Sequence, residues 1–527
     1  MPALVRSEHA LALHDCAATR RIEQAAAAAL PPHTLMQRAG LATARLALAI
    51  SPHARRIWIA CGPGNNGGDG LEAAMHLHRW GMHPVVTWLG APDQAPPDAR
   101  ASWQRAVAAG VPFAGQPPAD LGPQDLCIDA LLGIGAGRAP AGRMADWLRR
   151  MHSGPAPLLA LDLPTGLDAD TGWSQVQNAI YLIATRAYST RTSGQNGLKS
   201  VPRHHTLSLL TLKPGLFTAH GRDACGQVWF DDLGVSASLR DAEPPSAWLS
   251  GAPAAAPRPH ASHKGSFGDV AVIGGEALAA RGMGMTGAAL LAASAALHGG
   301  TGRVLVSLLD DGAITHIPTQ PELMLRRFER LELQALTVVC GCGGGDAVSA
   351  VLPAVLHAAP RLVLYADALN VIAADATLQT ALRQRAAAGQ ATVLTPHPLE
   401  AARLLGRTSA EVQQHRLRAA VQLADRFACA VVLKGSGTVI ATPGQAPHIN
   451  PTGNARLATA GTGDVLAGLI GARLAAGQNA AQAASAAVYL HGRAADCWPA
   501  ASTLTAGTLA RRLGAALAPA AAPIGAA

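Results

Sequence analysis

Short apolar runs alternate with glycine-rich polar loops and helical stretches along most of this 527-residue chain. Strands of a parallel sheet are buried on both faces and read as continuous apolar runs, and each needs a crossover helix to reach the next. The alternation therefore predicts an α/β protein with two doubly wound, three-layer domains. The predicted strands are 55–60, 84–89, 125–129 and 158–163 in the first half and 269–273, 303–309, 337–340, 361–365, 391–394 and 430–433 in the second.

Helical spacing and one proline-rich segment mark the limits of the two domains. Residues 17–50 predict two alanine-rich helices, and 285–297 predict another. Proline is dense within 240–262, where it would interrupt a helix or a central strand. We therefore expect one domain at 1–239, a linker at 240–262 and a second domain at 263–520.

Composition and charge exclude several classes of protein. With 49% apolar and 14% charged residues, the chain is able to bury large cores and is not disordered. Its net charge of +8 comes from scattered basic residues, so we expect anionic metabolites as ligands and no nucleic acid. The eight cysteines lack zinc-binding spacing, and no apolar run is long enough to span a bilayer. We expect a cytoplasmic protein with reduced cysteines, no membrane partner and a homo-oligomeric state.

The turn Gly461-Thr-Gly463, followed by Asp464, has the most distinctive chemistry of the second half. Its backbone is largely bare, and the apolar spacing of 465–474 predicts a helix that begins near Asp464. The free N–H groups of such a turn and the positive end of the helix dipole suit a phosphate. Asp464 would then accept a proton from a nucleophile that attacks this phosphate, or it would serve only as a helix cap.

A second group of candidates follows the strands of the first half. The first strand leads into Gly-Pro-Gly-Asn-Asn-Gly-Gly-Asp-Gly (62–70), a predicted loop before a helix at 71–80. Three of its glycines match G-x-G-x-x-G, but the next strand lacks the acidic residue that a dinucleotide redox site places at its end. Polar side chains at the ends of several strands would meet in one crevice: Asn66, Asp129, Asp162 and Thr165.

Four motifs of the first half resemble the NAD(P)H-hydrate epimerase family: the 62–70 segment, Asp-Ala-Leu-Leu-Gly-Ile-Gly (129–135), Leu-Asp-Leu-Pro-Thr-Gly-Leu-Asp (161–168) and Leu-Lys-Pro-Gly-Leu (212–216). The resemblance implies a Rossmann-like fold and interconversion of the R and S forms of hydrated NADH and NADPH. It implies a potassium ion near Asn66, Asp129 and Thr165, with Asp162 as the acid or base. The implied substrate-binding residues are Asn65, Asn66, Gly67, Gly68, Asp69, Gly133, Ile134, Gly135, Ala136, Gly137, Arg138, Ala139 and Asp162.

This half departs from the family pattern in two places. Thr165 stands where the family usually has serine, which keeps a hydroxyl for the ion. The segment 173–205 is a longer, polar connection, which is either a surface loop or a disturbance of the sheet edge. Lys213, within the Leu-Lys-Pro-Gly motif, is expected to serve local structure and is not assigned to the site.

Seven motifs of the second half resemble the dehydratase domain of the NAD(P)H-hydrate repair enzymes, which has a ribokinase-like fold. They are His-Lys-Gly-Ser-Phe-Gly, Met-Thr-Gly-Ala-Ala, Asp-Ala-Leu-Asn, Thr-Pro-His-Pro, Leu-Lys-Gly-Ser-Gly-Thr, Asn-Pro-Thr-Gly-Asn and Ala-Gly-Thr-Gly-Asp. The family usually has proline where Cys342 stands and aspartate where Tyr365 stands. The resemblance implies hydrated-cofactor contacts from Ala288, Gly343, His397 and Asp464. It implies nucleotide contacts from Lys434, Gly435, Ser436, Gly437, Thr438 and Gly463.

The two resemblances together predict a bifunctional metabolite-repair enzyme. Its substrates would be NADH-hydrate and NADPH-hydrate, with ADP as co-substrate, Mg²⁺ on the phosphates, and Asp464 as the catalytic base. ADP rather than ATP is inferred from the bacterial character of the chain and not from any residue. One alternative is a ribokinase-like vitamin or sugar kinase fused to a Rossmann-like nucleotide-sensing domain. Another is a binding or regulatory protein whose first half senses nucleotides without catalysis.

Overall fold

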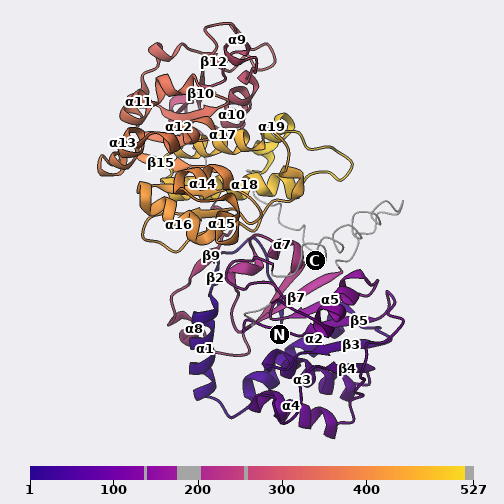
Figure 1. The fold of residues 1–527 in the computed structure, drawn as a ribbon. Coiled ribbons are helices and arrows are strands. Elements are labelled where there is room, and N and C mark those ends of the chain that lie inside the picture. The colour runs from indigo at the N-terminus through magenta and orange to yellow at the C-terminus, as the bar shows by residue number, and fades with distance from the viewer. Residues whose placement is uncertain (136–138, 175–202, 255–258, 517–527) are drawn as a thin grey trace. The chain divides into compact units, whose positions relative to one another are not determined.

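The computed structural model describes residues 1–135, 139–174, 203–254 and 259–516 (Figure 1). The chain divides into two compact units: unit 1 is Met1–Arg6 with Ala12–Ala247, and unit 2 is Ser7–Leu11 with the chain from Trp248 onward. The division falls within the proline-rich segment, but that segment also contains strand β9 (Ala247–Leu249). The assignment of Ser7–Leu11 to unit 2 was not predicted, because so short a segment carries no periodic signal.

Unit 1 is built on a seven-stranded sheet of order β1-β8-β7-β6-β5-β3-β4, parallel except for the antiparallel pair β1 and β8. All four predicted strands are present within two residues of their expected bounds. The strands are β1 (Ala3–Leu4), β3 (Ile57–Cys61), β4 (Pro84–Trp88), β5 (Leu126–Ala130), β6 (Leu158–Leu161), β7 (His204–Leu209) and β8 (Gln227–Asp231).

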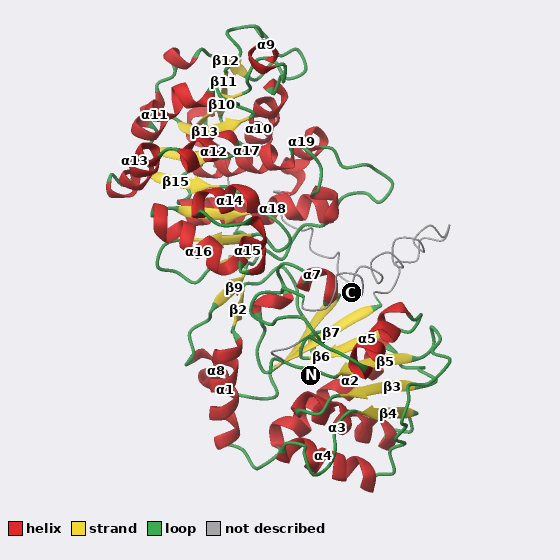
Figure 2. Cartoon of the chain, viewed as in Figure 1, coloured by secondary structure: helices red, strands yellow, loops and turns green. Residues whose placement is uncertain are grey.

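Helices cover both faces of this sheet, which makes three layers (Figure 2). Along β3, Ile57 and Ile59 pack into the core that contains residues of α1, α2 and α3, and Trp58 and Ala60 pack against α5. This period-two alternation is what a strand between two helical layers requires. The helices are α1 (Cys16–Ala28), α2 (Thr34–Ile50), α3 (Asn65–Arg79), α4 (Pro97–Ala108), α5 (Arg143–Ser153), α7 (Gly221–Ala224) and α8 (Ala237–Asp241), with a 3₁₀ turn at Pro214–Leu216.

Helix α3 corrects one prediction. It begins at Asn65, so most of the predicted loop 62–70 is helical. The glycines allow this helix to pack closely: a Cβ at Gly67 would lie 2.0 Å from the carbonyl oxygen of Gly62, and one at Gly68 would lie 2.7 Å from the Met36 side chain. Tertiary packing therefore overrides the low helix propensity of the segment.

Unit 2 contains most of an eleven-stranded sheet of order β12-β11-β10-β13-β14-β15-β16-β17-β18-β9-β2, and the division between the units falls within its last two strands, β9 and β2. The pairs from β12 to β16 are parallel, and β17 pairs antiparallel with both of its neighbours. All six predicted strands are present within two residues of their expected bounds. The strands are β2 (Leu11–Leu13), β9, β10 (Asp269–Gly274), β11 (Arg303–Leu308), β12 (Met324–Leu325), β13 (Thr337–Cys342), β14 (Arg361–Leu364), β15 (Ala391–Leu394), β16 (Ala430–Leu433), β17 (Val439–Ala441) and β18 (His448–Ile449).

The helices of unit 2 also form two layers. On β10, Val270 and Val272 belong to the core shared with α10, α17, α18 and α19, whereas Ala271 and Ile273 belong to the core shared with α11 to α16. The helices are α9 (Leu278–Arg281), α10 (Thr286–His298), α11 (Val348–Ala358), α12 (Asp367–Ala374), α13 (Ala376–Ala387), α14 (Pro398–Leu405), α15 (Ser409–Gln414), α16 (Arg416–Phe427), α17 (Thr462–Ala475), α18 (Ala480–Asp496) and α19 (Ala506–Ala516). Both units are therefore doubly wound α/β folds, as predicted.

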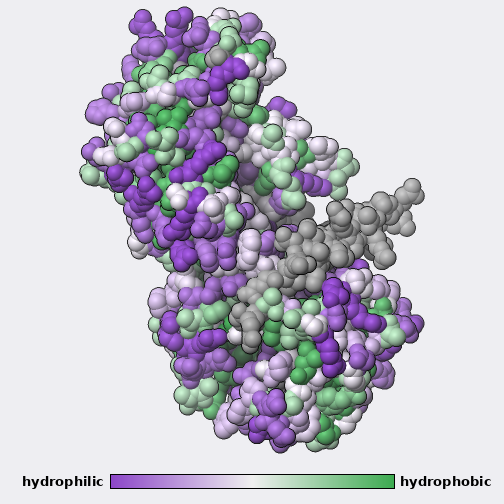
Figure 3. Space-filling view, viewed as in Figure 1, coloured by the Kyte–Doolittle hydropathy of each residue, from purple (hydrophilic) through white to green (hydrophobic). Residues whose placement is uncertain are grey.

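Hydrophilic side chains cover much of the visible surface, with small apolar patches between them (Figure 3). Among the described residues, no helix has the length and apolar character that a membrane span needs. Most of the predicted insertion at 173–205 lies outside the described residues, so its effect on the sheet edge stays an open prediction.

Candidate active sites

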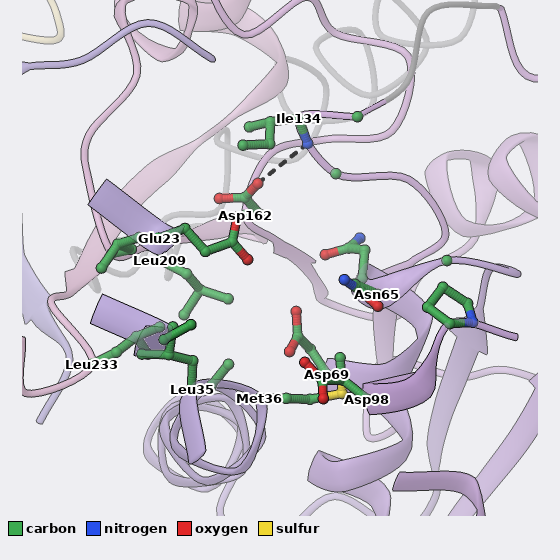
Figure 4. A pocket seen from close by; sticks show the side chains of 18 of the residues that line it. Glu23, Leu35, Met36, Asn65, Asp69, Asp98, Ile134, Asp162, Leu209 and Leu233 are labelled. Carbon is green, nitrogen blue, oxygen red and sulfur yellow. Dashed lines mark hydrogen bonds between the residues drawn. The ribbon is translucent and has the colours of Figure 1, made fainter. Parts of the chain in front are cut away.

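A cavity of about 640 Å³ lies in unit 1, beyond the carboxyl ends of the parallel strands (Figure 4). Of the predicted substrate-binding residues, seven line it: Asn65, Asn66, Asp69, Gly133, Ile134, Gly135 and Asp162. Gly67 and Gly68 instead serve the packing of α3, and Ala139 is not part of the described lining. Ala136, Gly137 and Arg138 lie outside the described residues.

Asp162 follows β6 and is held in an unusual backbone conformation. Its φ of 65° is in the left-handed region, which non-glycine residues seldom adopt. One carboxylate oxygen forms an ion pair with the ammonium of Lys213, and the other accepts a hydrogen bond of 3.3 Å from the N–H of Ile134. Both oxygens thus accept hydrogen bonds, as a carboxylate does, and the glycine-rich loop is tied to the side chain.

Lys213 is a site residue that the sequence prediction assigned only to local structure. Its side chain is buried and lines the same cavity. Besides Asp162, its ammonium donates to the carbonyl oxygen of Leu209 at 2.8 Å and to the hydroxyl of Ser208 at 3.4 Å. These three acceptors match the three donors of an ammonium, so Lys213 orients Asp162 and has no N–H left for a substrate.

Other carboxylates face the same cavity. Burial raises the pKa of Asp69 well above its usual value, and the charges of Asp162 and Glu23 raise it further. Burial also raises the pKa of Glu23, with a further contribution from Asp162. The fourth carboxylate, Asp98, contacts the ring of His33. The described lining is therefore rich in acids.

The residues predicted to hold potassium fit that ion. The carboxylate of Asp129 is buried and accepts hydrogen bonds from the N–H (3.0 Å) and hydroxyl (2.8 Å) of Thr165. Both polar atoms of the Asn66 side chain are buried, and neither has a hydrogen-bond partner in the described part of the chain. An amide oxygen without a partner, a buried carboxylate and a hydroxyl are together a kind of donor set that suits a hard cation.

In unit 2, Asp464 lies in the first turn of α17. The cap residue is Gly461, whose φ is 87°, so the reading of Asp464 as a simple helix cap is wrong. Burial raises the pKa of Asp464 to about 6, whereas Lys434 and a hydrogen bond from the thiol of Cys342 act in the opposite direction. A carboxyl group at a helix N-terminus, with a pKa near neutral pH, suits proton transfer beside a phosphate.

Lys434 follows β16 and is mostly buried. Its ammonium lies 4.0 Å from the centre of the Tyr365 ring and 3.8 Å from a carboxylate oxygen of Glu400. Burial lowers its pKa to about 8, although Glu400 and Asp464 favour the charged form. The Tyr365 hydroxyl in turn lies 2.4 Å from where a Cβ of Gly463 would stand. Tyr365 therefore packs between the lysine and the start of α17.

His397 has a clear structural role. Its ring accepts hydrogen bonds from the N–H groups of Leu399 (3.1 Å) and Glu400 (3.2 Å), which caps helix α14. Glu400 completes the capping box by accepting from the N–H of His397 at 2.7 Å. Through Glu400 the histidine is nevertheless connected to Lys434.

The remaining predicted residues of unit 2 lie in two further segments. Gly343 approaches Ala288 so closely that a Cβ on the glycine would lie 2.9 Å from the alanine methyl. The segment 434–438 is a turn in which Gly435 has a φ of 130°. Arg416, which sequence reasoning missed, supports this turn by donating to the carbonyls of Lys434 (3.2 Å) and Gly437 (3.4 Å).

Comparison with known proteins follows the same division. The profile of the family described as NAD(P)H-hydrate dehydratase matches residues 270–518, and that of the YjeF-related protein N-terminus matches residues 32–215. The chain is 33% identical to the bifunctional NAD(P)H-hydrate repair enzyme Nnr of Escherichia coli, over 88% of this chain and 85% of that protein. It is 43% identical to the ADP-dependent (S)-NAD(P)H-hydrate dehydratase of Neisseria meningitidis, over 47% of this chain and 83% of that protein.

A solved structure also resembles the second half. The ADP/ATP-dependent NAD(P)H-hydrate dehydratase of Bacillus subtilis, crystallised with ATP and Mg²⁺, is 29% identical, with a TM-score of 0.40 over 49% of this chain and 92% of that one. The two α/β units, with the acidic cavity of the first and the glycine-capped helix α17 of the second, are those of a two-domain enzyme that acts on nucleotides. The chain belongs to the family of bifunctional NAD(P)H-hydrate repair enzymes.

Proposed function

We propose that this chain carries out both reactions of NAD(P)H-hydrate repair. Unit 1 interconverts the R and S forms of the hydrate, and unit 2 dehydrates the S form with ADP to restore NADH or NADPH. The observation that carries the proposal is the position of Asp464 in the first turn of α17, directly after the glycine turn 461–463. The turn at Lys434 and the contact between Ala288 and Gly343 come from the other motifs that resemble the dehydratase domain.

In the dehydratase reaction the hydroxyl of the hydrated nicotinamide ring attacks the terminal phosphate of ADP. Asp464 accepts the hydroxyl proton, and the bond between the two phosphates breaks to release AMP. The carbon–oxygen bond of the phosphorylated ring then breaks, and phosphate leaves with the oxygen and the bonding electron pair. The neighbouring ring carbon loses a proton to water, which forms the carbon–carbon double bond and restores the reduced nicotinamide. The N–H groups at the start of α17 stabilise the charge on the transferring group.

Lys434 and the turn that follows it are suited to the nucleotide phosphates, because a buried ammonium gains most from an anionic partner. Magnesium supplies neutralisation of the phosphate charge when it is bound. The described residues contain no cluster of three or more His, Cys, Asp or Glu side chains that would hold a metal by themselves. This fits an ion held mostly by phosphates and water.

In the epimerase reaction Asp162 transfers a proton beside the hydroxyl-bearing carbon of the ring. Lys213 and the N–H of Ile134 fix its carboxylate at the cavity. Asn66, Asp129 and Thr165 would hold potassium, which would supply positive charge to the site. The acidic lining favours a substrate ring that becomes cationic during the reaction.

One experiment tests both halves. The full chain is incubated with mixed R and S NADPH-hydrate, Mg²⁺ and ADP, and the absorbance of regenerated NADPH is followed. We expect recovery of both forms. Regeneration of NADPH from the S form alone would contradict the epimerase part of the proposal. No regeneration with either ADP or ATP would refute the proposal as a whole. Phosphorylation of a vitamin or sugar instead would favour the kinase alternative.

A further inference from the structure

Glu23 of helix α1 lies outside every motif that points to the epimerase site. Its side chain nevertheless lines the unit 1 cavity, where Figure 4 shows it beside Asp162. Among the described residues, no hydrogen bond or ion pair to the Glu23 carboxyl is found. Glu23 is an exposed residue of α1, as Gln24 is, and structural contacts do not occupy its carboxyl group at the cavity near Asp162.

The two carboxyl groups have opposite environments. Asp162 is bound by Lys213 and by the N–H of Ile134, which are donors to a carboxylate. Glu23 has no such donors, and the charge that affects it most is the negative Asp162. Burial and the Asp162 charge both raise the pKa of Glu23, with smaller opposite contributions from Lys213 and Arg20. Two carboxyl groups whose environments differ in this way are suited to acid and base roles.

We propose that Glu23 is a second catalytic residue of the epimerase, which acts as the acid while Asp162 acts as the base. Lys213 is then a positioning residue that keeps Asp162 in the accepting form. This inference rests on the epimerase function proposed for unit 1 and adds the proton donor that this reaction needs.

The two roles account for inversion at the hydroxyl-bearing carbon. Glu23 gives its proton to the hydroxyl oxygen, and the carbon–oxygen bond breaks with its electron pair on the departing water. The lone pair of the adjacent ring nitrogen stabilises the resulting cation. A water molecule then adds to the other face and gives a proton to Asp162, so water is neither gained nor lost. Transfer of that proton to Glu23 through water restores the starting state, and the reverse reaction exchanges the roles.

The charges that face Glu23 come from several elements. They are Arg20 on its own helix, His33 before α2, Asp69 on α3, Asp98 on α4, Asp162 after β6 and Lys213 after β7. Since Glu23 and these three aspartates outnumber the three basic groups, the cavity stabilises a cation and keeps a proton on one of its carboxyl groups. These are the two conditions that the proposed step requires.

The test uses the full chain, R-enriched NADPH-hydrate and direct measurement of the R and S forms over a range of pH. We expect Glu23→Gln to lower kcat for epimerisation by about 100-fold with little change in KM, because general acid catalysis contributes roughly that much. The wild-type rate should fall at high pH, where Glu23 loses its proton, and this fall should be absent from the residual activity of Glu23→Gln. Formate should partly restore Glu23→Ala.

The matched control is Gln24→Ala, the exposed neighbour of Glu23 on α1. It should keep the wild-type rate, and Glu23→Asp should retain more activity than Glu23→Gln, which separates a chemical role from damage to the helix. Epimerisation by Glu23→Gln at the wild-type rate would overturn the inference. An equal loss in Gln24→Ala would also overturn it. A wild-type chain that does not epimerise would instead refute the proposed function of unit 1.

Discussion

The two units use the same pair of residue types in different ways. In unit 1, Lys213 contacts Asp162 directly, and its three donors are all engaged. In unit 2, Lys434 is directed toward Tyr365 and Glu400, and it influences Asp464 only through its charge. The first lysine therefore fixes a carboxylate, whereas the second stays available to a phosphate. This difference follows from the chemistry, since only the second reaction consumes a nucleotide.

Replacement of the unit 2 base should have the largest effect. Asp464→Asn keeps the shape of the side chain but cannot accept a proton, so we expect ADP-dependent dehydration to fall by about 10³- to 10⁴-fold. The measurement is NADPH formation from purified S-hydrate. Epimerisation of R-hydrate by the same preparation should be unchanged and serves as the control. A loss of both activities would mean that the two aspartates do not belong to separate reactions.

Replacement of Lys213 should separate its role in orienting Asp162 from its role in the stability of unit 1. Lys213→Met leaves Asp162 partly buried without its partner, which should destabilise unit 1 by about 3 kcal/mol and lower epimerisation by about 100-fold. The double variant Asp162→Asn/Lys213→Met removes both charges, so it should regain most of the stability but none of the activity. Chemical denaturation and R-to-S conversion measure the two effects. If the double variant recovered activity, the ion pair would be structural only.

The predicted and unpredicted residues differ in how far their partners lie along the chain. Asp162 and Asp464 are predicted from local motifs at a strand end and a helix start, and the structure places the first at the cavity and the second in the first turn of α17. Lys213 was misjudged because its partner lies 51 residues away, across the β6–β7 pairing. Arg416 was missed because its acceptors are backbone carbonyls of a turn that begins 18 residues later.

The fold followed from the sequence for a related reason. Buried parallel strands are continuous apolar runs, so their positions needed no tertiary information. Helix α3 was placed too late because its first turn contains glycines, whose helical state depends on the close approach of Met36 and Gly62. Composition gives the helix propensity of a segment, whereas packing against distant residues decides whether the segment is helical.

The pH dependence of dehydration should reflect the pKa values of Asp464 and Lys434 in unit 2. Asp464, with its pKa raised to about 6, must be unprotonated to act as a base, so kcat/KM should fall about tenfold per unit below pH 6. Lys434, with its pKa lowered to about 8, must be charged to bind phosphate, so kcat/KM should also fall above pH 8. A profile of NADPH formation from S-hydrate between pH 5 and 9 would check both limbs. A flat profile would contradict the assignment.

Exchange of the monovalent cation should affect unit 1 alone. With tetramethylammonium in place of potassium at equal ionic strength, the Asn66 amide and Asp129 lose their ion, and we expect epimerisation to slow by roughly tenfold. Potassium should restore the rate in the wild type but not in Asn66→Leu. S-hydrate dehydration, measured in parallel, should not respond. A wild-type rate without potassium would remove the ion from the proposal.

The smallest expected effect concerns the thiol that contacts the unit 2 base. In Cys342→Ala the Asp464 carboxylate loses a hydrogen-bond donor, so its pKa should rise and its charged form should become scarcer near pH 6. We expect kcat/KM for dehydration to fall roughly threefold to fivefold at pH 6 and to stay unchanged at pH 8, because the loss of one weak hydrogen bond is worth about 1 kcal/mol. Cys340→Ala is the matched control, since both thiols are fully buried on β13 and only Cys342 bonds to Asp464. Equal pH profiles for the two variants would show that burial and Lys434 alone set the charge of Asp464.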